Sequence, residues 1–399
     1  MVWNNASIRF RFVLKSFLFI NQKQFWLLFK LIKLMKMKKH LVQILAATLL
    51  VSSASYAGNP DRAGGAGATQ LLLNPYGRSA GLSNSNTASV RGIESFYLNI
   101  AGLAYSKKTE IQFSQMLYLV GTDMKINNLG FSQSLGENGT GGTIGLGITF
   151  WDMGNITNST IEQPDGTLGT YSPQIMNFGM AYSKKFSNSI SGGLLLRFVS
   201  EGIASVKAQG ITLDAGVQYQ TTLDPRKKIK KEDFRFGISI RNLGPDMAYE
   251  GDGLALRVII TQTGADRKLK VGSQVFNTPA LANIGVSYDM RLDKGEETYD
   301  HKLTVSGNFN YNAFASDIIA LGAEYSLKET FMLRAGYGHQ SGNFNSTDYK
   351  SPQYGVNVGL GFQMPISNSG TSFSLDYSYA PTVIFSGIHT LGLKLSLGN

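Results

Sequence analysis

Charged side chains that share a face with small and polar residues are the first candidates for chemistry in this chain. Arg197, Asp214 and Arg235 fall on three successive strand-like segments. Because an unpaired buried charge is costly, we expect these three to form an ion-paired ladder across an interior wall. The ladder has two possible roles. It either fills the lumen as a structural element, or it binds or gates a solute. Further charges of the same parity are Arg241, Asp289, Lys302, Arg334 and Asp376.

Catalytic and metal-binding motifs are missing from the sequence. It contains no Gly-x-Ser-x-Gly elbow, no Gly-x-x-x-x-Gly-Lys loop and no His-Glu-x-x-His pair. The four histidines have no metal-like spacing, and without cysteine there is neither a disulfide framework nor a thiolate metal site. We therefore expect no enzymatic activity, no cofactor and no metal.

The formal charge of +10 is concentrated at the amino end. Nine of the 37 basic residues and none of the 27 acidic residues precede Gly58, which leaves 28 basic residues in the rest of the chain. That remainder is nearly neutral, so it offers no basic surface for nucleic acid. Its 45 glycines, 11% aromatic residues and only 16% charged residues suit a closed all-β sheet.

A secretory signal is predicted at residues 35–57. Three lysines precede an apolar run, Leu41–Val51, and small residues then lead to a cleavage site after Ala57. Export by the Sec route follows. Residues 1–34 are too interrupted by basic residues to span a membrane. They are either an extension upstream of the true start or a long basic region of the signal itself.

Hydrophobicity alternates with a period of two through residues 109–399. In 211–219, apolar residues occupy the odd positions and small or polar residues the even ones. This pattern predicts a transmembrane antiparallel β-barrel. Fourteen segments carry it, near 109–120, 123–135, 141–152, 171–185, 188–200, 209–221, 232–241, 276–290, 299–311, 314–326, 330–338, 353–363, 370–379 and 387–397.

Loop lengths supply an independent argument for a barrel. If the first strand runs outward from a periplasmic amino terminus, the external connections include 153–170, 242–275 and 339–352, which are the longest three. A soluble sandwich would instead place charge on its wet face, whereas here that face is Gly, Ser, Thr and Asn. The sequence therefore predicts a barrel in the outer membrane of a Gram-negative bacterium, surrounded by lipid.

Residues 58–108 do not alternate and are predicted to form a small plug. They contain a glycine-rich run, Gly64–Ala68, and a leucine triplet, Leu71–Leu73. This segment resembles the amino-terminal signature of the PorV/PorQ family, a branch of the FadL-like barrels. Arg241-Asn242-Leu243-Gly244-Pro245 resembles a second motif of that family. The matching residues are Arg78, Gly81, Asn99, Ala101, Gly102, Leu103, Ala104, Asn242, Gly244 and Pro245.

The resemblance implies a component of the type IX protein secretion system. Such a protein binds the giant translocon barrel, the carboxy-terminal domains of exported cargo, or both. The roles of cargo shuttle, attachment subunit and divergent relative all stay open. The alternative is a FadL-like channel for hydrophobic or small solutes. A strand kink near inward apolar residues would mark a channel. Segment 314–326 has apolar residues on both parities, which either such an opening or packing against another barrel would explain.

Overall fold

The computed structural model describes residues 62–136, 139–165, 169–223, 233–260, 265–293, 300–340, 355–367 and 370–398. All of them belong to one unit, Tyr56–Asn399. The predicted signal, 35–57, and the extension before it, 1–34, lie outside the described residues.

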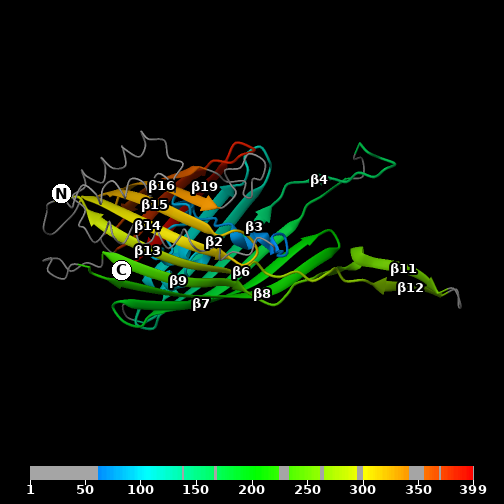
Figure 1. Ribbon diagram of the computed structural model, residues 1–399, viewed down its shortest axis with the longest axis horizontal. Helices are drawn as coiled ribbons and strands as arrows, with labels where there is room; N and C mark the ends of the chain where they lie inside the picture. Colours follow the sequence, from blue (N-terminus) through cyan, green and yellow to red (C-terminus); the bar gives the residue numbers. More distant parts are fainter. Residues whose placement is uncertain are drawn as a thin grey trace, which may run out of the picture. The chain divides into compact units, whose positions relative to one another are not determined.

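Fourteen antiparallel strands form one closed barrel, in which β1 pairs with β19 and β8 with β9 (Figure 1). The predicted all-β barrel of fourteen strands is confirmed, and each strand overlaps one predicted segment. The strands are β1 (Thr109–Leu117), β2 (Lys125–Ser134), β3 (Thr143–Asp152), β6 (Gln174–Lys185), β7 (Ile190–Ile203), β8 (Val206–Thr221), β9 (Phe234–Leu243), β13 (Leu281–Arg291), β14 (His301–Asn312), β15 (Ile318–Leu327), β16 (Phe331–Gln340), β17 (Val356–Pro365), β18 (Ser372–Ala380) and β19 (Ile388–Leu397).

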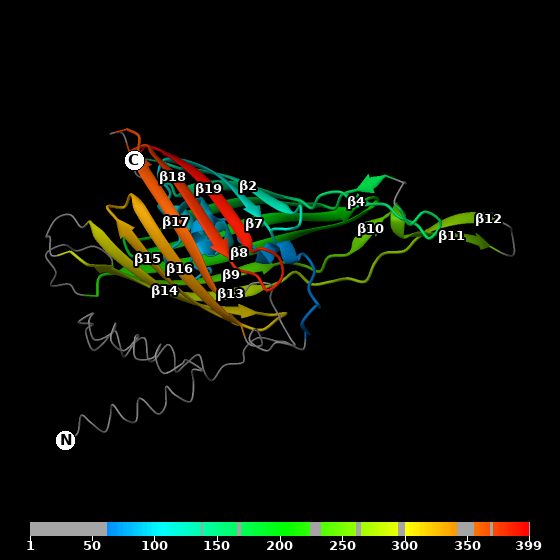
Figure 2. The same cartoon turned by 90° about the horizontal axis from the view of Figure 1, so that it is seen from above.

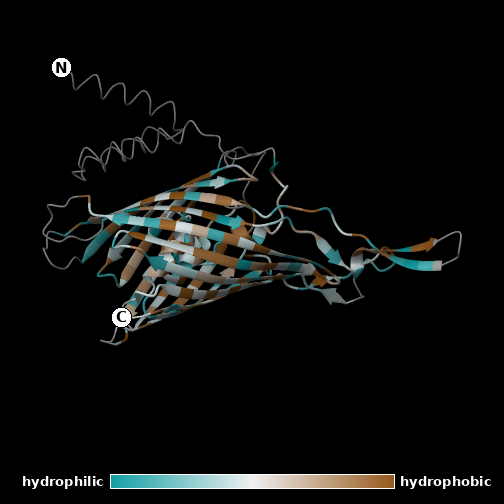
Figure 3. Cartoon of the chain, turned by 90° about the horizontal axis from the view of Figure 1, so that it is seen from below, coloured by the Kyte–Doolittle hydropathy of each residue, from teal (hydrophilic) through white to brown (hydrophobic). Residues whose placement is uncertain are grey.

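The alternation of the strands separates an apolar outside from a polar inside. In β17, Val356, Val358 and Leu360 are exposed, whereas Asn357 between them is buried. Apolar and polar residues alternate in the same way along the other strands (Figure 3). A continuous apolar outer surface is stable only against lipid. Among the described residues, no helix combines the length and hydrophobicity that a membrane crossing requires.

The two ends of the barrel differ in their connections. The name "long-loop end" is used for the end of the barrel at which β1 finishes. The name "terminal end" is used for the opposite end, at which β1 starts. At the long-loop end a connection after β3 holds β4 (Ile156–Thr157) and β5 (Thr170–Tyr171). The connection after β9 holds β10 (Tyr249–Gly251), η6 (Asp252–Leu254), β11 (Ala255–Ile260) and β12 (Ala265–Lys270), and β11 and β12 project beyond the barrel (Figures 1 and 2).

Two of the three predicted external connections, 153–170 and 242–275, leave the barrel at this same end. Most of the third, 341–352, lies outside the described residues.

Residues 62–106, the amino-terminal segment, run inside the barrel from the long-loop end to the terminal end. Ala66 bridges to Asn277 near the start of β13, and Ser106 contacts Ser132 near the end of β2. Between them lie four short helices, drawn in blue within the ring of strands (Figure 1). These are η2 (Thr69–Leu72), α4 (Gly77–Gly81), η3 (Gly92–Tyr97) and η4 (Ile100–Tyr105).

The main apolar core lies between the amino-terminal segment and the inner wall. Its buried members from the segment include Tyr76, Phe96 and Leu103, and they meet Ala181 of β6 and Leu195 of β7. Burying this surface favours folding by roughly 25 cal/mol for each Å² removed from water. The segment therefore contributes to the stability of the barrel that surrounds it.

Inward glycines let the segment approach the wall closely. At Gly336 of β16, an added Cβ would lie 2.2 Å from the carbonyl carbon of Leu82. Gly338 lies two residues further along β16, on the same face. The nearest heavy atom to a Cβ added at Gly338 would be 3.7 Å away. The pair separates the effect of close packing from the general effect of replacing a strand glycine.

We predict that Gly336→Ala lowers the free energy of unfolding by about 1–3 kcal/mol through overpacking. Gly338→Ala, the matched control, should leave it unchanged or slightly raised. Urea titration in detergent micelles, read by heat-modifiable electrophoretic mobility, measures both. Equal stabilities of the two variants would contradict the packing described above.

Candidate functional site

A polar hub occupies the inner wall where β9 ends. The pairing of β8 with β9 shifts register between Leu213 and Ala215, and Asn242 adopts a left-handed backbone with φ of 59°. The backbone N–H of Asn242 donates to Asp214 Oδ1 at 2.7 Å. The side-chain Oδ1 of Asn242 accepts from Arg197 Nη1 at 3.0 Å. Its Nδ2 donates to the Pro279 carbonyl at 3.1 Å. Because of this bulge, Asn242 of β9 forms hydrogen bonds with Arg197 of β7 and Asp214 of β8, and so links three strands.

The hub holds one acid between two arginines. Arg197 Nη2 lies 3.2 Å from Asp214 Oδ2, and Arg241 Nε lies 3.9 Å from the same oxygen. All three side chains are buried. Arg197 also donates to the Phe96 carbonyl at 2.8 Å, so the hub ties the wall to η3.

Arg235 is not part of this ladder, which corrects the sequence prediction. Its Nη2 lies 2.6 Å from Asp289 Oδ2 on the neighbouring strand β13. The reason is antiparallel register, which places Arg235 opposite Gln220, far from Asp214 along β8. At about 3.3 Å a residue, the six residue steps from Arg235 to Arg241 span roughly 20 Å. Arg241, and not Arg235, is therefore the third charged residue of the cluster with Arg197 and Asp214.

The Asn-x-Ala-Gly-Leu motif of the amino-terminal segment is a packing element against β8 and β9. Asn99 caps η4 by accepting from the Ala101 nitrogen at 3.2 Å, and its Nδ2 donates to the Val217 carbonyl at 3.0 Å. A Cβ on Gly102 would lie 2.2 Å from the Val90 carbonyl oxygen. Leu103 is fully buried in the core.

The other matched motif residues also sit at close approaches. A Cβ on Gly81 would lie 3.0 Å from Gly359 Cα, and one on Gly244 would lie 2.5 Å from the Ile211 carbonyl oxygen. Pro245 follows directly where the chain leaves β9. These residues position the segment and the turn.

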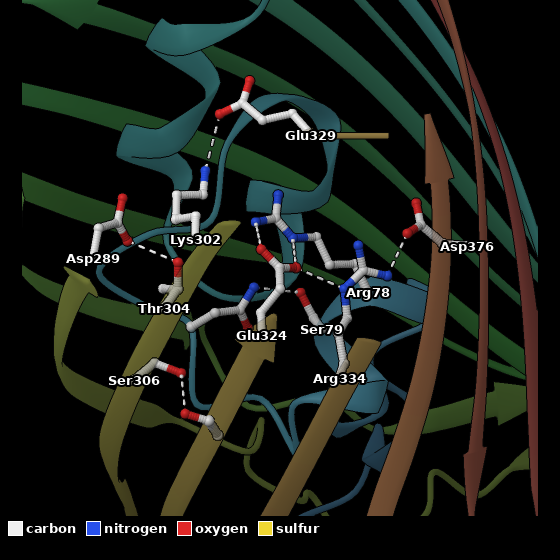
Figure 4. Close-up of polar contacts among 12 residues, drawn as sticks. Arg78, Ser79, Asp289, Lys302, Thr304, Ser306, Glu324, Glu329, Arg334 and Asp376 are labelled. Carbon is white, nitrogen blue, oxygen red and sulfur yellow. Dashed lines mark hydrogen bonds and ion pairs between the residues drawn. The ribbon is translucent and has the colours of Figure 1, made fainter. Parts of the chain in front are cut away.

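Helix α4 is anchored to the wall by a chain of ion pairs (Figure 4). Arg78 donates to both oxygens of Glu324, at 3.0 and 2.9 Å. Arg334 Nε donates to the same carboxylate at 2.6 Å, and its other end pairs with Asp376. On the opposite side of α4, Asn357 Nδ2 donates to the Ala80 carbonyl at 3.0 Å.

A cavity of about 220 Å³ lies on the terminal side of α4 and is lined by charge. Burial raises the pKa of Glu94, although the Lys394 ammonium opposes that shift. Burial likewise lowers the pKa of Arg91 to about 10. The charged lining residues are Arg78, Arg91, Glu94, Arg235, Asp289, Lys302, Glu324, Glu329, Arg334, Asp376 and Lys394.

A second cavity, of about 350 Å³, lies on the long-loop side of α4 and has a different chemistry. Among its described lining residues, Arg241 is the single charged one, and eight side chains are carboxamides. Removing water from an unpaired carboxamide costs about 1–3 kcal/mol. The carboxamides are Asn74, Asn84, Asn283, Asn308, Asn310, Asn312, Gln340 and Asn357.

Sequence reasoning missed this second cavity and the partners of Arg78. One signal was available, because Asn308, Asn310 and Asn312 recur at every second position of a single strand and so share a face. No such signal links Arg78 to Glu324, which lies 246 residues away. Within the described ranges, no group of three or more His, Cys, Asp or Glu side chains is placed to hold a metal ion.

No protein-family model and no curated protein matches this chain. Solved structures do match. The toluene transporter TodX of Pseudomonas putida superposes with a TM-score of 0.52 at 12% identity, over 82% of this chain and 99% of TodX. The fold is that of an outer-membrane β-barrel. The outer membrane protein Omp33 of Acinetobacter baumannii matches at a TM-score of 0.35 and 7% identity, over 74% of this chain and all of Omp33, 100%.

We predict that Asp214→Ala destabilises the barrel by about 3–5 kcal/mol, because it leaves Arg197 and Arg241 buried without their counter-charge. Urea unfolding in micelles measures the change. Asp252→Ala is the control, since Asp252 pairs with Lys268 at 3.0 Å on an exposed surface and should give no measurable change. A wild-type midpoint for Asp214→Ala would mean that the hub is not a stabilising element.

Proposed function

We propose that this protein is an outer-membrane channel that passes small solutes along the barrel axis, with the amino-terminal segment as its gate. The observation that carries the proposal is the pair of cavities on opposite sides of α4. The helix separates them, since Arg78 lines the terminal cavity and Ala80 the long-loop cavity. A displacement of α4 would join the two into one passage.

Several polar contacts hold α4 and the residues after it against β14–β17, beside the close packing of Leu82. They comprise the Arg78–Glu324 pair, the Asn357–Ala80 hydrogen bond and a 2.7 Å contact between the hydroxyls of Ser85 and Ser306. Exchanging a neutral hydrogen bond for one to water costs a net ~0.5–1.5 kcal/mol, and a bond between charged groups ~1.5–3 kcal/mol. Glu324 would keep its pair with Arg334 if Arg78 moved away. Movement of α4 is therefore less costly than movement of η3 and η4, whose side chains form the apolar core.

Passage through the side wall has less support than passage along the axis. Segment 314–326, whose apolar residues on both parities suggested an opening, becomes β15, which pairs without interruption with β14 and β16. The register shift lies between β8 and β9, where the Asp214 hub fills the inside. TodX, which shares this fold, is a toluene transporter, and this adds support for a channel.

A removable cross-link tests the gate. The chain has no cysteine, and the Ser85 and Ser306 hydroxyl oxygens are 2.7 Å apart, so cysteines at these two positions would place their sulfurs next to each other. We predict that oxidised Ser85→Cys/Ser306→Cys loses most of its solute flux, because the cross-link fixes the segment across the lumen. Proteoliposome uptake of glucose, glycine, benzoate and toluene, before and after dithiothreitol, measures it.

The single variants Ser85→Cys and Ser306→Cys, oxidised in parallel, are the controls and should keep wild-type flux. Undiminished flux through the oxidised double variant would contradict a gate at this segment. Wild-type protein that passes none of the four solutes would contradict the channel itself.

A role in type IX secretion is the second candidate, and a specific surface favours it. The hairpin of β11 and β12 projects from the long-loop end, and Leu256, Ile259 and Leu269 on it are more than half exposed. Exposed apolar patches of this kind are suited to protein partners. This candidate otherwise rests on the resemblance of residues 65–105 and 241–245 to the PorV/PorQ family.

We predict for this second candidate that a tagged protein purified in mild detergent retains a giant translocon barrel or cargo with a shared carboxy-terminal domain. Deletion of residues 252–270 should abolish that retention, because it removes the projecting apolar hairpin. Mass spectrometry of the retained proteins measures both. A barrel that purifies alone from native outer membranes would count against the secretion role.

A further inference from the structure

We infer that the long-loop cavity is a binding site for a small, uncharged, hydroxyl-rich solute of monosaccharide size. The inference deepens the proposed channel function and rests on it for the statement that this solute is the one transported. Binding itself needs only the cavity. Its volume of about 350 Å³ falls at the small end of the ~300–1,000 Å³ found for ligand sites.

One wall of the cavity is a preorganised array of carboxamides. Asn283 Oδ1 accepts from Asn310 Nδ2 at 2.6 Å and from Asn308 Nδ2 at 3.3 Å, while Asn283 Nδ2 donates to Ser239 Oγ at 3.2 Å. These bonds fix which way each amide points. They use the amide nitrogens of Asn308 and Asn310, and among the described residues the Asn310 Oδ1 accepts no hydrogen bond. The wall therefore keeps an acceptor that suits a hydroxyl group of a ligand.

The facing wall combines apolar and aromatic side chains. Leu72 and Leu73 of the amino-terminal segment, together with Tyr97 of η3 and Tyr118 after β1, line this side. Tyr97 is held by a 2.8 Å hydrogen bond between its hydroxyl and Thr149 Oγ1. A sugar ring has a hydroxyl edge and an apolar C–H face, so it matches a site with one polar and one aromatic wall.

Charge in the cavity excludes ionic ligands. Its one cation, Arg241, already donates to the Leu71 carbonyl at 3.3 Å and faces Asp214. A carboxylate ligand would find no free cation, and the described lining contains no acid that could bind an ammonium group. A hydrocarbon would displace water from the amides and return no hydrogen bonds. A neutral polyhydroxylated molecule can form hydrogen bonds with the carboxamides of the wall. It brings no charge that would stay unpaired, and it leaves no amide without a hydrogen bond.

The test is isothermal titration calorimetry on the full mature protein in micelles with glucose, glucuronate and toluene. Glucuronate keeps the sugar ring and adds a carboxylate, whereas toluene keeps only the apolar face. We expect heat of binding for glucose, and at least about tenfold weaker binding of the other two. Asn308→Leu/Asn310→Leu should weaken glucose binding by about tenfold or more, since it removes two amides from the wall.

Asn188→Leu, an exposed amide in the turn at the terminal end, is the matched control and should bind glucose like wild type. Heat-modifiable electrophoretic mobility establishes that each variant is folded. Asn310→Gln, which keeps a carboxamide, should bind glucose more tightly than the double leucine variant. Toluene or glucuronate binding more tightly than glucose would overturn the inference, as would unchanged glucose binding by the double leucine variant.

The flux assay separates this inference from the channel proposal. Glucose that binds at the asparagine wall without crossing proteoliposomes would support the site and contradict the channel. A gated flux of toluene or benzoate, with no glucose binding, would support the channel and overturn the site.

Discussion

Closure of the sheet is the constraint on which the rest of this structure depends. In lipid every backbone N–H and C=O of a strand must be paired, so β1 must meet β19 and no edge can stay open. Closure forces the period of two, because one face of every strand then meets lipid and the other meets the lumen. It also creates an interior that fourteen strands cannot fill with their own side chains. The amino-terminal segment fills that interior.

The contacts between the segment and the wall divide into two kinds with different consequences. Helices η3 and η4 bury aromatic and aliphatic side chains against β6 and β7, and the Asp214 hub ties η3 to the wall through Arg197. Helix α4 is instead held by ion pairs and single hydrogen bonds. One half of the segment thus behaves as core, and the other half as a partition that polar interactions keep in place. The two cavities lie on either side of that partition.

The chemistry of the two cavities follows from how their polar groups are used. In the terminal cavity most charges are paired with opposite ones, because a buried charge without a partner is costly. In the long-loop cavity neutral amides orient one another, and the Asn310 Oδ1 keeps its capacity to accept a hydrogen bond. For the proposed channel, this arrangement favours a neutral solute, because an ionic one would compete with the ion pairs that hold α4.

The sequence by itself determined the strands and their faces, since lipid on one side imposes an alternation that each strand displays locally. It also showed that Arg197, Asp214 and Arg235 point inward, and which connections are long. Which charges meet was decided by tertiary structure. The register of β8 against β9 and a bulge at Asn242 replace Arg235 by Arg241, and the path of α4 brings Arg78 to Glu324. Such pairs are set by strand register and by a segment threaded through the closed barrel, and neither leaves a local pattern in the residues.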